Sequence, residues 1–327
     1  MSTRTWDLPL RLFHWGLAAS AVAAFLTGDE LTRGRAHVVL GTLAASLVAF
    51  RFAWGFLGEA TSRWRRFTTV HTRLAALSAA TGLLLVAGLA LTGVMVLGGE
   101  EGRGMAAGLV SARMGVDVHT VHRLLAWAGA AWLTIHLAGV AKQSWVERRN
   151  LVRAMIDGRK EAEGRSVALR SGVAVAMVAT VPLLVALPDR APAPPERPVA
   201  WDRECGDCHL AFPPDLLPAR SWEAMLASED HFGEFLGLDP DTTRELGDWA
   251  TAHAADAGET EHAVRIAATV DADAAPQRIT TLPWWEEIHA DVPLGDEPRT
   301  RCADCHPDAG TGTFDARSAH PEERRET

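Results

Sequence analysis

Two short motifs of the same form carry cysteine and histidine at a spacing that can hold a porphyrin. CGDCH begins at residue 205 and CADCH at residue 302, and together they contain all four cysteines of the 327-residue chain. Two thiols separated by two residues can add to the two vinyl groups of one haem, and the histidine that follows is then held under the iron. The sequence therefore predicts two covalent c-type haems. Their attachment residues are Cys205, Cys208, Cys302 and Cys305, and their proximal ligands are His209 and His306.

The same cysteine pairs have two alternative interpretations, a zinc site built from both pairs or a thioredoxin-like redox motif. Four thiolates alone would satisfy zinc, so a zinc site needs no histidine after each pair. A histidine nevertheless follows both pairs. Haem attachment is therefore the favoured interpretation.

Each haem iron needs a sixth ligand, and the chain after residue 200 offers few candidates. This part contains one methionine, Met225, and no lysine, so histidine for both irons is the simplest solution. We favour His231, in EDHFGEF, and His289, which follows two tryptophans in WWEEIHAD. The remaining histidines lie in polar, Ala- or Glu-rich surroundings and are expected at the solvated surface. They are His253, His262 and His320.

Five apolar segments precede this region, and each is long enough to cross about 30 Å of hydrocarbon as a helix. They lie near residues 11–28, 37–57, 74–98, 121–141 and 168–187. The first lies close to the amino terminus, but no cleavage site and hydrophilic mature domain follow it. It is therefore expected to be a retained span rather than a signal peptide.

Charge predicts the orientation of these spans. The loops after the second and fourth segments are rich in arginine and lysine, which places them in the cytoplasm. Five crossings then put the carboxyl-terminal part outside, where c-type haem is attached. Residues 1–188 hold 20 Lys+Arg and 11 Asp+Glu, whereas residues 189–327 hold 12 Arg and 30 Asp+Glu. The acidic part repels phosphate backbones, so we set nucleic acid aside as a partner.

Histidines inside the spans predict two further haems. Ionisable residues within a membrane are costly and by default functional, and neutral imidazoles are natural haem ligands. His122 and His136 are 14 residues apart, which places them on one helix face about 21 Å apart along the axis. His14 is level with His136 near the cytoplasmic side, and His37 is level with His122 near the outer side. These two pairs predict two stacked b-type haems between facing helices.

Four other residues near the spans are less decisive. Arg51 and Arg123 would contact haem propionates or a quinone carbonyl, or else extend to the membrane interface. His119 lies about 100° from the His136 face and is expected at the interface. His71, next to a basic loop, is a reserve ligand, a quinone-site residue or an ordinary loop-end histidine.

The first half of the chain resembles the prokaryotic cytochrome b561 family, which includes b-type anchor subunits of nickel-iron hydrogenases. The segments that carry the resemblance are WDLPLRLFHW at 6–15, HVVLGTLAASLVAFRFAWGF at 37–56 and HLAGVAKQSWVERRNLVRAMIDGRK at 136–160, together with the His122/His136 spacing. Over residues 4–165 the resemblance implies a helix bundle whose four histidines hold two b haems that exchange electrons with membrane quinone. VHTRLAAL at 70–77 departs from the family because the usual Asn-Pro-Leu-Gly does not follow the histidine.

The second half is similar to the small bacterial di-haem cytochrome c family over residues 201–316. The similarity lies in ECGDCHLAFPPDLLPARSWEAM at 204–225, EDHFGE at 229–234, RITTLPWWEEIH at 278–289 and CADCHPDAGTGTF at 302–314. It implies that His231 and His289 are the distal ligands. It also implies a small periplasmic haem protein as redox partner.

These patterns predict an all-α protein. Four transmembrane helices surround two b haems, a fifth helix tethers them, and a small, mainly α and loop-rich di-haem c domain follows. The expected boundaries are 1–166 for the membrane domain, 167–188 for the fifth helix, 189–200 for a linker and 201–327 for the c domain. The linker contains most of PDRAPAPPERP, whose prolines favour an extended spacer.

The expected function is electron transfer in the bacterial inner membrane. Electrons would pass from membrane quinol through two haem b and two haem c to a soluble periplasmic haem protein, a quinol:cytochrome-type oxidoreductase activity. Reverse flow, from a periplasmic donor to quinone as in a dehydrogenase anchor, is one alternative. A haem-based redox sensor without turnover is another, although a sensor would be expected to carry a signalling domain. The acidic exterior favours a partner with a basic patch.

Overall fold

The computed structural model describes residues 8–28, 34–58, 62–64, 73–146, 148, 150–157, 195–290, 292, 301–312 and 314. These residues form two compact units. The first unit contains the long helices of the amino-terminal half. The second contains the carboxyl-terminal part together with residues 98–102 and 107–116, which lie in and around a turn between two of the long helices.

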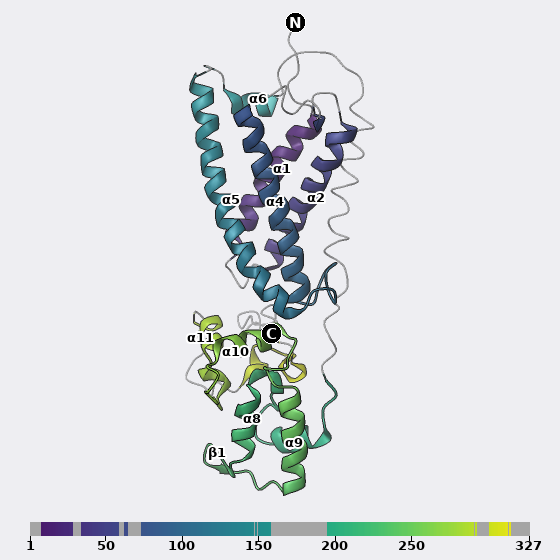
Figure 1. Cartoon of the computed structure of the whole chain (residues 1–327), viewed down its shortest axis with the longest axis vertical. Helices are drawn as coiled ribbons and strands as arrows, with labels where there is room; N and C mark the ends of the chain where they lie inside the picture. Colours follow the sequence, from purple (N-terminus) through teal and green to yellow (C-terminus); the bar gives the residue numbers. More distant parts are fainter. Residues whose placement is uncertain are drawn as a thin grey trace, which may run out of the picture. The chain divides into compact units, whose positions relative to one another are not determined.

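Four helices of the first unit are long and apolar enough to cross a membrane. They are α1 (Leu8–Leu26), α2 (Gly34–Leu57), α4 (Arg73–Gly99) and α5 (Ala112–Val146). They run alongside one another, and the short α6 (Leu151–Asp157) lies at the end where α1 begins and α5 ends (Figure 1). Arg11 ties α6 to α1, because its guanidinium donates a hydrogen bond to the carbonyl of Ile156 (2.5 Å).

The side chains of these helices are arranged for an apolar environment. Phe13, Leu47, Phe50 and Trp54 are buried together between α1 and α2. Many other large apolar side chains point outward, including Leu84 and Leu91 on α4. Contiguous apolar surface of this kind is covered in a bilayer by lipid chains, and helices satisfy every backbone hydrogen bond internally, as the bilayer requires.

The first three expected spans agree with the helices to within three residues at each end. The fourth is longer than expected. α5 has 35 residues, which makes it about 52 Å long, so it extends beyond a hydrocarbon layer of about 30 Å. The fifth expected span, near 168–187, and most of the proline-rich linker lie outside the described residues.

The second unit is built from short helices joined by turns, as the sequence predicts. Its α-helices are α8 (Ala219–Leu226), α9 (Pro240–Ala252), α10 (Glu261–Thr269) and α11 (Pro283–Ile288). A π-helical turn, η3 (Trp201–Cys205), and the 3-10 turn η4 (Pro214–Leu216) precede α8. The 3-10 turn η5 (Ile279–Thr281) precedes α11, and η6 (Cys302–Asp304) and η7 (Ala309–Thr311) follow it. Their core contains Trp201, Leu217, Leu246, Ile266 and Leu282, all of them fully buried.

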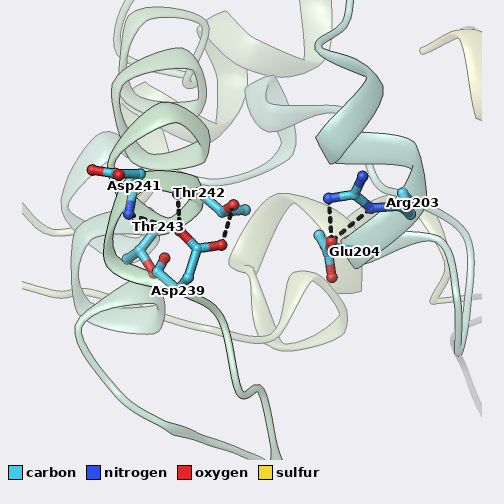
Figure 2. A network of polar contacts seen from close by, with 6 residues as sticks. All are labelled: Arg203, Glu204, Asp239, Asp241, Thr242 and Thr243. Carbon is cyan, nitrogen blue, oxygen red and sulfur yellow. Dashed lines mark hydrogen bonds and ion pairs between the residues drawn. The ribbon is translucent and has the colours of Figure 1, made fainter.

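Capping side chains fix where the longer helices begin. The carboxylate of Asp239 accepts hydrogen bonds from the backbone N–H groups of Asp241 and Thr242 at the start of α9, and from the hydroxyl of Thr242 (Figure 2). Thr260 caps α10 in the same way, through the N–H of Ala263. These bonds satisfy donors that a helix leaves unpaired at its amino end.

A two-strand hairpin, β1 (Asp230–His231) and β2 (Glu234–Phe235), was not expected from the sequence. The strands pair antiparallel, with His231 opposite Glu234. Phe232 and Gly233 form the turn with φ of 58° and 97°. A positive φ is strained for phenylalanine, and the Arg278 guanidinium lies 3.9 Å from the centre of its ring. The hairpin holds His231 at the start of this turn.

Candidate functional site

Both CxxCH motifs lie on short turns of the second unit. Cys205 ends η3 and Cys302 begins η6, and all four thiols are free. Burial, followed by the charges of Glu204 and Asp202, raises the pKa of the Cys205 thiol to about 11. Glu204 also pairs with Arg203 (Figure 2). Burial also raises the pKa of Cys302. Burial therefore favours the neutral thiol over the thiolate at both cysteines.

Each histidine of a CxxCH motif faces one of the two histidines favoured as distal ligands. The ring centroids of His209 and His231 are 6.1 Å apart, and those of His306 and His289 are 6.3 Å apart. The β1–β2 hairpin presents His231, and the carboxyl end of α11 presents His289. The structure thus brings His231 beside His209 and His289 beside His306.

These separations fit a metal between the two rings. An imidazole nitrogen binds a first-row metal at about 2.0 Å, and the ring centre lies about 1.1 Å farther, so two axial rings have centroids about 6 Å apart. Among the described residues, no group of three or more His, Cys, Asp or Glu side chains converges as ligands of zinc would. The geometry fits a bis-imidazole haem at each CxxCH motif.

Hydrogen bonds also set which nitrogen of each ring is available. His209 Nδ1 lies 2.8 Å from the carbonyl of Leu210, and His289 Nδ1 lies 2.9 Å from that of Trp285. A carbonyl only accepts, so Nδ1 carries the proton in both rings and the lone pair is on Nε2. For His231, burial and then the neighbouring His209 and Arg278 lower the pKa, which favours the neutral imidazole that binds iron.

The first unit contains a third pair of the same kind. His37, near the start of α2, and His122 on α5 have ring centroids 6.0 Å apart. The Nδ1 of His37 lies 2.8 Å from the carbonyl of Ala24, so its proton is on Nδ1. The other predicted pair, His14 on α1 and His136 on α5, is close enough to interact electrostatically. The ring of Trp132 stacks on His136, with centroids 5.1 Å apart.

Comparison with known proteins then decides the family. Residues 201–314 match the family described as dihaem cytochrome c. The chain is 35% identical to "Diheme cytochrome c from Rhodobacter sphaeroides", a match that covers 37% of this chain and 100% of that chain, with a TM-score of 0.32. This chain belongs to the dihaem cytochrome c family.

Two further similarities complete the comparison. A diheme cytochrome c from Shewanella baltica is 32% identical over 36% of this chain and 86% of that chain, with a TM-score of 0.28. Residues 5–158 match the family prokaryotic cytochrome b561. A protein of Bradyrhizobium diazoefficiens described as "Probable Ni/Fe-hydrogenase B-type cytochrome subunit" is 24% identical over 211 residues, covering 48% of this chain and 85% of that protein.

The chain is thus a b561-type membrane cytochrome fused to a dihaem c domain. We call residues 5–158 the b561 part and residues 201–314 the dihaem c part. The two families imply haem b in the first and haem c in the second, and electron transfer as the function. The four apolar helices place the b561 part in a lipid bilayer.

The arginines and minor histidines of the b561 part differ in their surroundings. Arg51 is buried, at 5% exposure, and its guanidinium lies 4.0 Å from the centre of the Trp64 ring. Arg123 is exposed and His119 is half-buried, both on α5. His71 lies outside the described residues. Of these residues, Arg51 has the setting of a site residue, because a deep charge in a membrane protein is costly.

One histidine of the dihaem c part contradicts its expected position at the surface. His262 is 8% exposed, and its Nε2 lies 2.8 Å from Oδ2 of Asp215. Its ring lies beside Trp284 and Phe314, and Phe314 also contacts His306. The polar local sequence does not reveal this burial, because the covering aromatic rings come from distant segments. The cluster therefore lies in the interior beside His306, and not at the solvent surface.

Sequence reasoning also missed two hydroxyl groups on α4. Thr92 Oγ1 lies 2.8 Å from Nδ1 of His122, and Ser78 Oγ lies 3.3 Å from Nδ1 of His136. Serine and threonine are common in apolar helices, where they bond back to their own helix, so their types alone indicate nothing. The available signal was their separation of 14 residues, which equals the separation of His122 and His136.

Proposed function

We propose that this chain is a quinol-oxidising electron carrier of the bacterial inner membrane, which passes electrons through two haem b and two haem c to a soluble haem protein in the periplasm. The amino terminus would be cytoplasmic and the dihaem c part periplasmic. The proposed ligand pairs are His14/His136 for the inner haem b, His37/His122 for the outer haem b, and His209/His231 and His306/His289 for the haem c groups.

The observation that carries this proposal is the recurrence of one geometry. Three imidazole pairs, in two different units, have ring centroids 6.0, 6.1 and 6.3 Å apart. Each pair includes an imidazole whose Nδ1 is engaged by a backbone carbonyl. This is the separation that two imidazoles sharing one haem iron would have, and each of these pairs joins two of the histidines that the sequence predicts as ligands.

Haem, when bound, supplies one-electron chemistry, and the chain supplies ligation, orientation and dielectric. Oxidation of one quinol releases two electrons and, to water, two protons. Each quinol would therefore reduce two molecules of a one-electron acceptor. Arg51, buried against Trp64, is our candidate for a polar contact with quinone or with a haem propionate, and Arg123 is a second.

Pigment analysis tests the cofactor content. Pyridine haemochromogen spectra of the purified chain are expected to show equal amounts of protohaem and covalently bound haem, two of each per chain. Absence of either pigment would overturn the proposal.

Stopped-flow mixing tests the activity. A quinol analogue, decylubiquinol, is mixed with the oxidised chain in detergent, and haem b and haem c absorbance are followed separately. The wild type is expected to reduce both. His122→Ala is expected to abolish haem c reduction, whereas the control His119→Ala, three residues away on α5, is expected to retain it. If decylubiquinol left the wild-type haems oxidised, the proposed donor would be wrong.

One comparison favours the opposite direction of flow as a second candidate function. The relative from Bradyrhizobium diazoefficiens is described as a hydrogenase cytochrome subunit. An equivalent role here would pass electrons from a periplasmic donor through the chain to quinone. Steady-state rates in both directions, measured with a basic mitochondrial-type cytochrome c and decylubiquinol or its quinone, decide between the two. A faster rate of quinone reduction would favour this second candidate.

A further inference from the structure

A matched pair of hydroxyl groups lies along α4, opposite the two histidines of α5. Thr92 lies against His122, and Ser78 lies against His136. Both pairs of positions are 14 residues apart, so each set shares one face of its helix to within about 40°. The two helices run antiparallel here, because Ser78, earlier on α4, lies beside His136, later on α5. A single face of α4 thus contacts both α5 histidines on their Nδ1 side.

Two glycines of α4 near these hydroxyl groups also leave room for the imidazoles and their neighbours. A Cβ added at Gly93 would lie 3.3 Å from Cε1 of His122. A Cβ added at Gly82 would lie 2.3 Å from the Trp132 ring that stacks on His136. Glycine is needed at Gly82 because a methyl group there would overlap an aromatic ring. Hydroxyl and glycine therefore occur together at each histidine.

The hydrogen bonds of Thr92 define the direction of its contact with His122. Thr92 Oγ1 lies 2.8 Å from the carbonyl of Gly88, one turn earlier on α4, and 3.2 Å from that of Leu89. A hydroxyl has one hydrogen, and carbonyls can only accept it, so that hydrogen is already used. Oγ1 must then accept from the Nδ1–H of His122. The lone pair of His122 is left on Nε2.

The two sites differ in the strength of this contact. At the outer pair both Nδ1 atoms have an acceptor at 2.8 Å, Ala24 O for His37 and Thr92 Oγ1 for His122. At the inner pair the contact of Ser78 with His136 is longer, at 3.3 Å. An accepted Nδ1–H bond increases the electron donation of an imidazole to a metal, which favours the ferric form.

We propose that Thr92 and Ser78 are positioning residues that hold the two α5 histidines in the Nδ1–H tautomer and lower the reduction potentials of the haems, Thr92 more strongly than Ser78. The inference rests on the proposed ligation of haem b by His122 and His136. It assigns to α4, which carries none of the four proposed b-haem ligands, control over both redox centres of the bundle.

The test is redox potentiometry of the full haem-loaded chain in detergent. Thr92→Val keeps the size of the side chain and removes the acceptor, and Thr92→Ser keeps the acceptor. Thr134→Val is the matched control, because Thr134 makes the same bond one turn back along a helix, to Ala130 (3.0 Å), on the exposed side of α5. The wild type is expected to resolve two haem b components.

Thr92→Val is expected to raise the reduction potential of one haem b component. At a fixed ambient potential its ratio of ferrous to ferric haem should increase about tenfold, which corresponds to about 59 mV for one electron. Ser78→Ala is expected to raise the reduction potential of the other haem b component by a smaller amount. Thr92→Ser and Thr134→Val are expected to match the wild type. If Thr92→Val kept its haem and both potentials, the inference would be wrong.

Loss of haem is also informative. If Thr92→Val loses one haem b while Thr92→Ser retains it, the acceptor is needed to hold the ligand, which supports the inference. If both variants lose haem, the residue acts through packing and the inference fails. A wild type that binds no haem b would instead overturn the proposed function itself, so the two failures are distinguishable.

Discussion

Replacing Asp215 by alanine removes the acceptor at the centre of the buried cluster beneath the His306 site. Oδ2 of Asp215 accepts hydrogen bonds from His262 Nε2 and Thr260 Oγ1, both at 2.8 Å. The side chains of His262 and Asp215 are only 10% and 16% exposed, so water replaces these bonds poorly. Removing this acceptor leaves two buried donors unpaired, which costs about 1–3 kcal/mol each, or about 2–6 kcal/mol together. At about 4 °C per kcal/mol for a region of this size, the melting temperature should fall by about 8–24 °C.

The assay is thermal unfolding of the haem-loaded full chain in detergent, followed by the absorbance of covalently bound haem. Asp248→Ala, an exposed aspartate on α9, is the control and should change stability by less than about 0.5 kcal/mol. If Asp215→Ala and the control had the same melting temperature, the cluster would contribute nothing to the stability of the dihaem c part, and the reasoning would be refuted.

The same variant has a pH signature. Burial opposes ionisation of Asp215, but the hydrogen bond and charge of His262 outweigh it and hold the pKa of the carboxyl below its usual value. A folded-state pKa below the unfolded value of about 3.9 gives stability that is complete above that pH and is lost as pH falls through the folded value. The difference between wild type and Asp215→Ala should therefore shrink as pH falls below about pH 4. A difference that did not shrink below about pH 4 would contradict this account.

Three further outcomes are expected. Gly82→Ala places a methyl group 2.3 Å from the Trp132 ring and should lower the ratio of haem b to haem c. Gly139→Ala, where a Cβ meets nothing within 4 Å, should leave that ratio unchanged, and an equal ratio in the two variants would contradict this account. Replacing both Cys302 and Cys305 by alanine should halve covalently bound haem per protohaem in pyridine haemochromogen spectra, and a full complement would speak against thioether attachment there. Raising ionic strength from about 0.05 to 0.5 M should slow reduction of a basic cytochrome c by about tenfold or more, and an unchanged rate would argue against an acidic docking face.

Local patterns predicted much of this protein. The CxxCH motif for covalent haem attachment consists of five consecutive residues, so it can be read directly from the sequence. Membrane spans can be read in the same way, because the thickness of the bilayer sets the length of each apolar run. Helical periodicity also indicated which spans carry histidines at matching depth. The structure brings His37 to His122, and His231 and His289 to the CxxCH histidines.

The remainder depends on contacts between distant segments. Asp215 and His262 are 47 residues apart, and no local pattern shows that a histidine in a polar stretch will be covered by Trp284 and Phe314. The β1–β2 hairpin was missed because its turn uses Phe232 at a positive φ, where glycine or asparagine would be the usual signal. Both ends of α5 lie beyond the predicted span because its polar flanks continue the helix past the apolar run.

The carboxyl ends of α9 and α11 carry the same small arrangement. At α11, the backbone N–H and the Nδ1 of His289 both reach the carbonyl of Trp285, and the two rings stack at 4.3 Å. At α9, His253 does the same with Trp249, with rings 5.1 Å apart. A tryptophan four residues before a terminal histidine thus orients an imidazole by purely local means. Within the part of the chain that the structure describes, His289 has a second imidazole opposite it, that of His306, and His253 has none. Five consecutive residues can therefore orient an imidazole, but a residue from a distant segment decides whether a second imidazole faces it.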